Sequence, residues 1–421
     1  MTKNTTIALV AIFLIGIVYR LWFASLVPQP VINDQLDYRW FSLQMLKDPH
    51  MLAAHTFRTY PTSLMDALIY KVAGYENLRA VFIVQAVMDS AISLMIFYVL
   101  SRGLKLRKAA WIGAILYSLN PFTAGYVNVI LSEILMVFCM AATAVTGVLL
   151  LKKPSVLRGC LLGIAAGLTA ETRNAAFAWT AVPIGLLFFF IPFKKHIGVY
   201  VAILAGLLLT VLYPLAANWR AYHVINITTL DDMYAREFYD GVIIKELAPL
   251  APPLPEATYQ MYAEYHTEYT PAHQNNAWRN AMIKKYYTLA WNLIKKNPWD
   301  YIQTRFHKMW FVWQKEALFV YVEPGYASHK IYTYFANLIL LALAVIGLIY
   351  YPVKTFKTAT GKWVRFMILG SFLYATFAFS FTQAEGRLTI PFYPLVILAA
   401  ALGISQIMQT IQLIYRNHQQ K

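Results

Sequence analysis

Runs of about 20 apolar residues recur along the chain, which is the length a helix needs to cross the hydrocarbon core of a bilayer. The first run continues to about Val27, too far for a cleaved signal peptide, so we expect it to stay as a helix. The pattern predicts about ten spanning segments, at 5–27, 79–101, 109–126, 130–151, 157–173, 176–193, 197–217, 331–351, 363–382 and 389–412. We therefore expect an all-α polytopic membrane protein that forms a single domain over residues 1–421.

Two long polar connections, 28–78 and 218–330, separate these segments. In the first, Asp37–Leu46 and Thr62–Val72 have the pattern of amphipathic helices that lie in a membrane interface. The second has helical patterns around 275–315 and is dense in tyrosine and tryptophan. Aromatic residues at that density suit the headgroup level of a bilayer, and they could equally stack on sugars.

Basic residues decide the orientation of the spans, because lysine and arginine favour cytoplasmic loops. With the N-terminus inside, the inner stretches hold no aspartate or glutamate and 16 basic residues: Lys3, Arg102, Lys105, Arg107, Lys108, Lys152, Lys153, Arg158, Lys194, Lys195, Lys354, Lys357, Lys362, Arg365, Arg416 and Lys421. We predict a cell-membrane protein with both termini in the cytoplasm and both long connections outside. Contact with anionic membrane lipids then explains the net charge of +16, and no nucleic-acid partner is expected.

Two carboxylates follow the first span. Asp34 and Asp37 are three residues apart, so on a helical turn they share a face. Neighbouring carboxylates repel, and burial raises the pKa of one of them, which suits a general base. The alternative is a structural one, in which Asn33 or Asp34 caps the helix that follows.

Other ionisable residues stand at the outer ends of predicted spans. Glu133 opens one span, Arg173 ends another, and Arg387 lies before the last span beside Gly386. Each has a simpler explanation: a helix dipole for Glu133, a local ion pair or snorkelling for Arg173, and a headgroup anchor for Arg387. Asp89 falls in mid-span, which marks a functional or polar-network position.

Motifs for other chemistry are weak. The nine histidines show no metal-ligand spacing, and the chain has no Walker loop or Gly-rich dinucleotide turn. Cys139 and Cys160 lie in apolar runs, so we expect neither a disulfide nor a thiolate metal site. No cofactor is certain, although Asp34, Asp37 and Glu133 could hold a divalent metal ion.

The order of short motifs over nearly the whole chain resembles the GT-C superfamily of membrane glycosyltransferases. The similar branch is the protein-mannosyltransferase-like one, which includes the aminoarabinose transferases. The motifs are Tyr19–Leu21, Asp34–Tyr38, Arg58–Pro61, Val84–Ala86, Tyr117–Pro121, Leu131–Glu133, Gly167–Arg173, Asn218–Arg220, Lys296–Pro298, Lys308–Trp310 and Gly386–Pro391. The chain departs from the family at Tyr60, where a second proline is usual, at Asn174, which replaces a proline, and beside Arg387, which lacks a tyrosine neighbour.

The resemblance implies an inverting sugar transfer from a polyprenyl-phosphate donor on the outer face of the membrane. The acceptor would be a hydroxyl or phosphate of lipid A, another envelope glycan or a protein. Asp34 would be the base, with Asp37 as the other candidate on the same turn. Tyr38 and Glu133 would contact substrate.

The same resemblance assigns the donor phosphate to arginine, whose planar fork binds two oxygens at once. The candidates are Arg387, Arg58 and Arg173. A secondary transporter or lipid flippase of an envelope precursor is the alternative function. It predicts inverted repeats and helices broken near the midplane, and the sequence shows neither.

Overall fold

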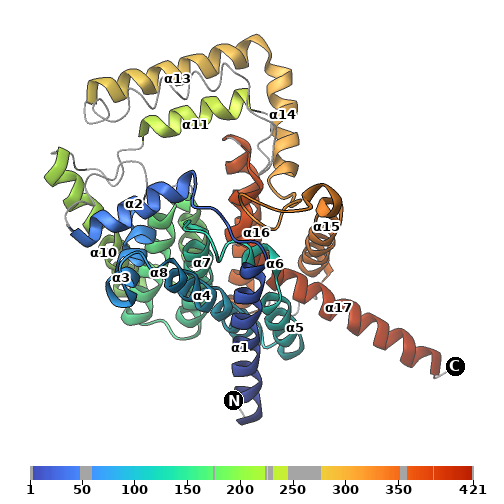
Figure 1. Ribbon diagram of the computed structural model, residues 1–421. Helices are drawn as coiled ribbons and strands as arrows, with labels where there is room; N and C mark the ends of the chain where they lie inside the picture. Colours follow the sequence, from blue (N-terminus) through green and yellow to red (C-terminus); the bar gives the residue numbers. More distant parts are fainter. Residues whose placement is uncertain are drawn as a thin grey trace.

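The computed structural model describes residues 3–47, 59–173, 176–222, 225, 231–244, 276–350, 358–382 and 384–419 (Figure 1). The described part is built from helices. The α-helices are α1 (Lys3–Leu26), α2 (Asp34–Lys47), α3 (Tyr60–Ala73), α4 (Leu78–Tyr98), α5 (Arg107–Ser118), α6 (Pro121–Ala124), α7 (Glu133–Lys152), α8 (Val156–Thr172), α9 (Ala181–Leu187), α10 (Ile197–Tyr222), α11 (Asp231–Ile243), α13 (Asn276–Lys296), α14 (Pro298–Phe311), α15 (Tyr326–Tyr350), α16 (Ala359–Ser380) and α17 (Tyr393–Gln419).

Seven helical segments in the described residues are long and apolar enough to cross a membrane. They are Lys3–Leu26, Leu78–Gly103, Glu133–Lys152, Ile197–Ala216, Tyr326–Ile349, Ala359–Ser380 and Gly386–Gln419. The protein is therefore a polytopic membrane protein.

The other three predicted spans take different forms. Segment 109–126 contains the 12-residue helix α5, and a new helix then starts at Pro121, because a proline disfavours helical backbone at the residue before it. Segment 157–173 is the 17-residue helix α8. Segment 176–193 is broken into short pieces, of which the longest is α9. The prediction of about ten spans is thus not confirmed within the described residues.

Close backbone approach fixes two helix pairs. A Cβ at Gly163 of α8 would lie 2.1 Å from the Ile203 carbonyl oxygen of α10. A Cβ at Gly347 of α15 would lie 2.0 Å from the Ala399 carbonyl oxygen of α17. Neither position tolerates a side chain, and small residues of this kind are how membrane helices gain packing contact.

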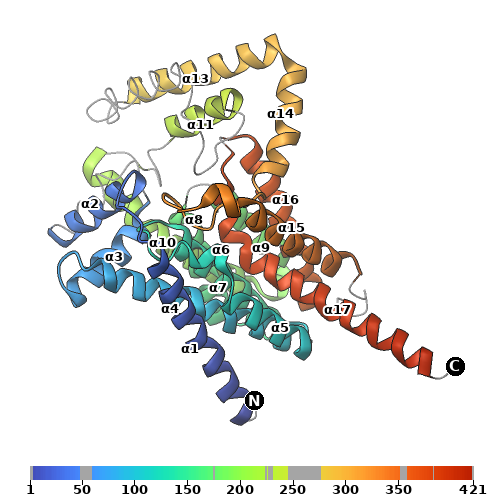
Figure 2. The ribbon, with the colours of Figure 1, turned by 45° about the vertical axis from the view of Figure 1, so that its right-hand side comes forward.

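The predicted interfacial helices are present: α2 and α3 in the first connection, and α13 and α14 in the second. In both views, α11 and α13 lie at the end of the molecule opposite the N-terminal end of α1 (Figure 1 and Figure 2). Two buried cations of α14 hold this end together. Lys308 Nζ donates to the carbonyls of Gly241 (2.7 Å) and Thr382 (3.0 Å), and Arg305 donates to those of Gly241 and Ser380.

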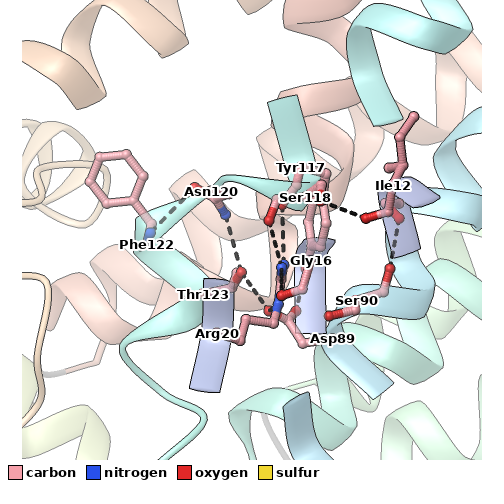
Figure 3. A network of polar contacts seen from close by, with 11 residues as sticks. Ile12, Gly16, Arg20, Asp89, Ser90, Tyr117, Ser118, Asn120, Phe122 and Thr123 are labelled. Atoms are coloured by element: carbon pink, nitrogen blue, oxygen red, sulfur yellow. Dashed lines mark hydrogen bonds and ion pairs between the residues drawn. The ribbon is translucent and has the colours of Figure 1, made fainter. Parts of the chain in front are cut away.

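Asp89 belongs to a buried polar network between α1, α4 and α5 (Figure 3). Arg20 Nε donates to Asp89 Oδ2 at 2.5 Å, and the Tyr117 hydroxyl donates to Asp89 Oδ1 at 2.5 Å. Arg20 also donates to the backbone carbonyls of Tyr117 (3.1 Å) and Ser118 (2.8 Å). The sequence left two interpretations of Asp89 open, a functional position or a polar network. In the structure Asp89 belongs to a polar network.

Candidate functional site

Asp34 and Arg387 meet, although 353 residues separate them in the chain. Arg387 Nη1 lies 3.0 Å from Asp34 Oδ2, and Arg387 Nε bonds Glu385. Asp34 is the first residue of α2, so its carboxylate stands at a helix N-terminus, and it also binds an arginine. Both side chains keep partial exposure, at 21% for Arg387 and 27% for Asp34, which leaves the pair open to a ligand.

Glu133 and Arg173 form a second pair. Arg173 Nη1 lies 3.0 Å from Glu133 Oε1. Glu133 is the first residue of α7 and is buried, and its Oε2 has no hydrogen bond to any residue that the structure describes. The helix-dipole explanation fits the position of Glu133, whereas the partner of Arg173 is not local but lies 40 residues away in the chain. One carboxylate oxygen of Glu133 remains for another partner.

The two pairs share one site. The carboxylates of Glu385, Asp34 and Glu133 all act electrostatically on Arg387. Tyr126 stands among them: burial raises the pKa of its phenol, Glu133 and Glu385 raise it further, and Arg387 and Arg173 lower it. Four residues predicted from the sequence, Asp34, Glu133, Arg173 and Arg387, are thus brought together at one end of the helix bundle.

Buried amides fix the backbone that presents these residues. Gln35, next to Asp34, accepts a hydrogen bond from the Ile130 backbone N–H at 2.9 Å. Gln85 of α4 donates to the Val129 carbonyl at 3.0 Å, and Asn128 donates to the Ala24 carbonyl at 2.9 Å. These bonds tie α1, α2 and α4 to the segment that leads into Glu133, so the geometry of the site is set before any ligand arrives.

The turn that contains Arg387 is itself fixed by hydrogen bonds to the segment around Lys315. Lys315 Nζ donates to Thr389 Oγ1 at 2.7 Å and to the Val312 carbonyl at 3.1 Å. A Cβ at Gly386 would lie 3.0 Å from the Gln314 carbonyl oxygen, so the glycine allows this backbone to pass close by. Burial lowers the pKa of Lys315 to about 7.

An apolar cavity of about 650 Å³ begins beside this site. Its walls come from α3, α4, α7 and α8, including Leu64, Leu68 and Leu135. Thr59, which precedes α3, donates to the Thr172 carbonyl at 2.7 Å, one residue before Arg173. Tyr60, which follows Thr59, lines the cavity, so the start of α3 connects the cavity wall to the residue before Arg173.

Not every predicted residue is placed in the site. Arg58 lies outside the described residues. Asp37 is half-buried in the first turn of α2, and Tyr38 is buried at 6% exposure. Within the described ranges, no group of three or more histidine, cysteine, aspartate or glutamate side chains could hold a metal ion.

Two further carboxylates belong to the candidate site and were not predicted from the sequence. Glu385 stands two residues before Arg387 and pairs with it. Glu237 of α11 is under the influence of Arg173 and Glu385; burial raises the pKa of its carboxyl, and Asp240 and Glu385 add to that rise. Nothing in the helical pattern around Glu237 marks it, because only the folding of the second connection over the bundle brings it there.

Comparison with known proteins finds similarity among solved structures. No protein-family model matches the chain, and no curated protein does. Among solved structures, it is similar to the archaeal oligosaccharyltransferase AglB from Archaeoglobus fulgidus, solved with an inhibitory peptide and a dolichol-phosphate. The TM-score is 0.51 at 12% sequence identity, over 100% of this chain and 52% of that one.

At this identity the likeness shows the fold alone: this chain has a fold similar to that of the archaeal oligosaccharyltransferase. It spans about half the length of the archaeal enzyme. Membership of the GT-C superfamily, and the branch within it, stay predictions.

Proposed function

We propose that the protein is an inverting glycosyltransferase that moves a sugar from a polyprenyl-phosphate donor to an acceptor hydroxyl or phosphate on the outer face of the membrane. The observation that carries the proposal is the meeting of Asp34, Glu133, Arg173 and Arg387 at one site next to an apolar cavity. It unites a candidate base, candidate phosphate ligands and space for a lipid chain.

The donor phosphate is assigned to Arg387 and Arg173. Each is partly exposed, at 21% and 19%, so a phosphate oxygen can reach each guanidinium. Arginine binds phosphate through two parallel N–H donors, and fixed cations in a site shielded from water stabilise the charge that develops on a leaving phosphate. Arg58, which precedes the cavity-lining helix α3 in the chain, stays a proposal as a third donor ligand.

The lipid chain of the donor is assigned to the apolar cavity. A polyprenyl chain carries no polar group, and its burial among leucine and isoleucine side chains is favourable in proportion to the apolar area removed from water. The cavity is lined by Tyr60, next to the residue that bonds the Thr172 carbonyl, and by Leu135, two residues after Glu133, so a chain lying in it would present its phosphate toward the site cations. The archaeal enzyme with the same fold was solved with a dolichol-phosphate, which is a lipid phosphate of this kind.

The reaction then proceeds by direct displacement. Asp34 takes the proton of the acceptor hydroxyl, the acceptor oxygen forms a bond to the anomeric carbon, and the bond from that carbon to the phosphate oxygen breaks. The polyprenyl phosphate leaves with the bonding electron pair. One displacement at the anomeric carbon inverts its configuration.

Donor binding would also prepare the base. In the structure, Asp34 and Glu385 already occupy the guanidinium of Arg387. A carboxylate held by an arginine is a weaker base than a free one, because the cation stabilises its charged form. A phosphate that binds Arg387 would displace Asp34, so the base becomes available only when the donor is present.

The acceptor is assigned to the neighbourhood of Glu237 and of the second oxygen of Glu133, which can form hydrogen bonds to its hydroxyl groups. The acceptor is an envelope glycan, lipid A or a protein. A comparison of the host's envelope glycans by mass spectrometry, with and without this gene, would identify both the acceptor and the sugar.

The test of the proposed site is binding of polyprenyl phosphate, the carrier without its sugar, to the purified protein in lipid nanodiscs. Arg387→Ala should weaken binding by about 10- to 100-fold, because hydrogen bonds to charged groups contribute about 1.5–3 kcal/mol. Arg387→Lys should restore only part of it, since the fork is lost. Arg39→Ala, which removes an arginine paired with Glu76 elsewhere, is the control. Wild-type affinity in both Arg387 variants would refute the assignment.

A further inference from the structure

The buried face of α3 carries four polar side chains that have no hydrogen-bond partner among the described residues. Thr62, Ser63, Asp66 and Tyr70 are each 1% exposed. Neither oxygen of Asp66, and none of the other three hydroxyl groups, makes a hydrogen bond within the part of the chain that the structure describes. These positions recur every three to four residues, so they form one polar stripe along the helix.

This stripe faces the packed neighbours of α3. The helix packs on α2, where Met45 meets Ala67, and also contacts α4 and α8. Its other face, which includes Leu64, Leu68 and Val72, lines the apolar cavity. Because Asp34 is the first residue of α2, the α2–α3 contact joins the candidate base to a wall of the cavity.

Within the described residues, no charged group of the neighbouring helices pairs with Asp66. On α2, Arg39 pairs with Glu76, and this pair acts on Tyr70 rather than on Asp66.

On the other two neighbours the situation is the same. Asp89 of α4 is paired with Arg20. Glu171 of α8 acts on Tyr60, at the first turn of α3. Within the described residues Asp66 therefore has no ion-pair partner, and burial raises the pKa of its carboxyl well above the usual range.

We propose that Asp66 is a proton-binding site that controls the contact between α2 and α3. With its proton, the carboxyl is neutral and the two helices pack as observed. When the proton leaves, an unpaired charge lies in an apolar contact, and the contact loosens because separation admits water. The contact itself does not depend on the proposed transfer; its effect on Asp34 and on the cavity rests on that function.

The direction of the pH dependence follows from the burial of the carboxyl. The packed state binds the proton more tightly than the open state does, so packing is favoured at low pH. It weakens as pH rises above the ordinary aspartate range and toward the raised pKa of the packed state. Asp66→Asn keeps the shape of the side chain and cannot ionise, so it should remove this dependence.

The experiment measures the accessibility of the contact through cysteine labelling of the full-length protein in nanodiscs. Cys139 and Cys160 are first replaced, and a single cysteine is placed at Ala67, which is 4% exposed in the α2–α3 contact. The matched control is a single cysteine at Val72, which is 89% exposed on the same helix. The ratio of the two maleimide labelling rates cancels the intrinsic pH dependence of the thiol.

We expect this ratio to rise between pH 5.5 and 8.5, by up to ~10-fold per pH unit for one linked proton, and to stay flat in the Asp66→Asn background. A flat ratio with Asp66 present, or a rise that persists in Asp66→Asn, overturns the proposal. If the Ala67 cysteine variant does not fold, hydrogen exchange of α2 and α3 amides in the otherwise native chain and in Asp66→Asn gives the same comparison. Loss of sugar transfer with a normal labelling response would contradict the proposed function and leave this inference standing.

Discussion

Asp34→Asn separates the two roles proposed for Asp34. As the proposed base, Asp34 would accelerate transfer. As a partner of Arg387, it competes with the donor phosphate for the same guanidinium. Asparagine caps a helix about as well as aspartate, so the start of α2 should be preserved. The substitution should therefore reduce turnover and, at the same time, tighten binding of the lipid phosphate.

The expected magnitudes differ in size and sign. Loss of general-base catalysis should reduce transfer on the order of 10²- to 10⁴-fold. The Arg387–Asp34 contact is 3.0 Å long with both side chains partly exposed, and a pair of this kind contributes about 0.2–1 kcal/mol. Its removal should therefore lower the Kd for polyprenyl phosphate by no more than about 5-fold.

The assay compares Asp34→Asn with Asp37→Asn at matched protein level. Transfer is measured in membranes, and polyprenyl phosphate binding is measured on purified protein in nanodiscs. Asp37 shares the turn, but Asp34 is the residue whose carboxylate contacts Arg387, so we expect the smaller loss at Asp37. Full transfer activity in both variants would remove this turn as the catalytic centre. Weaker lipid-phosphate binding in Asp34→Asn would refute the competition between carboxylate and phosphate.

Three further predictions concern the membrane topology, the buried network around Asp89 and the buried cation Lys308 of α14. A membrane-impermeant thiol reagent should label single cysteines at Val72 and Trp299, which are 89% and 67% exposed, but not one at Lys153; the reverse pattern would invert the proposed orientation. Asp89→Ala should leave an arginine buried without its partner and destabilise the fold by about 3–5 kcal/mol, seen as a lower Tm in detergent. Burial lowers the pKa of Lys308 to about 7, so between pH 7 and its ordinary value the unfolded chain binds more protons and stability rises with pH. Lys308→Met should flatten that rise in thermal melts from pH 7 to 9, and an unchanged slope would contradict the assignment.

Much of the fold could be predicted because a bilayer imposes strong rules on sequence. Seven long apolar helices and the interfacial helices α2, α3, α13 and α14 follow from hydrophobic pattern alone. The three segments that differ carry prolines or are short, and their apolar composition does not reveal whether the backbone continues as one helix. Segment 176–193 is the clearest case, since Pro183 and Pro192 interrupt an otherwise uniform apolar run.

The site was predictable in part for a related reason. A charge at the end of an apolar span is unusual, so Glu133, Arg173 and Arg387 could be found by position. The sequence could not predict which of these charges form pairs. The pairs depend on backbone positions that buried amides such as Gln35 fix, and nothing in the sequence distinguishes these amides. Asp66 was also not singled out, since a carboxyl on an amphipathic helix is normally exposed, and only the packing of α2 reveals its burial.

The distance along the chain between Asp34 and Arg387 has a consequence for biosynthesis. Arg173 is synthesised 40 residues after its partner Glu133, whereas Arg387 is synthesised 353 residues after its partner Asp34. At translation rates of about 5–20 residues per second, this wait is roughly 20–70 seconds. During that time the early helices can already be inserted in the membrane, yet the centre has no Arg387. A nascent or truncated chain that ends before this turn therefore cannot carry the complete candidate site, and this site is among the last parts of the protein to form.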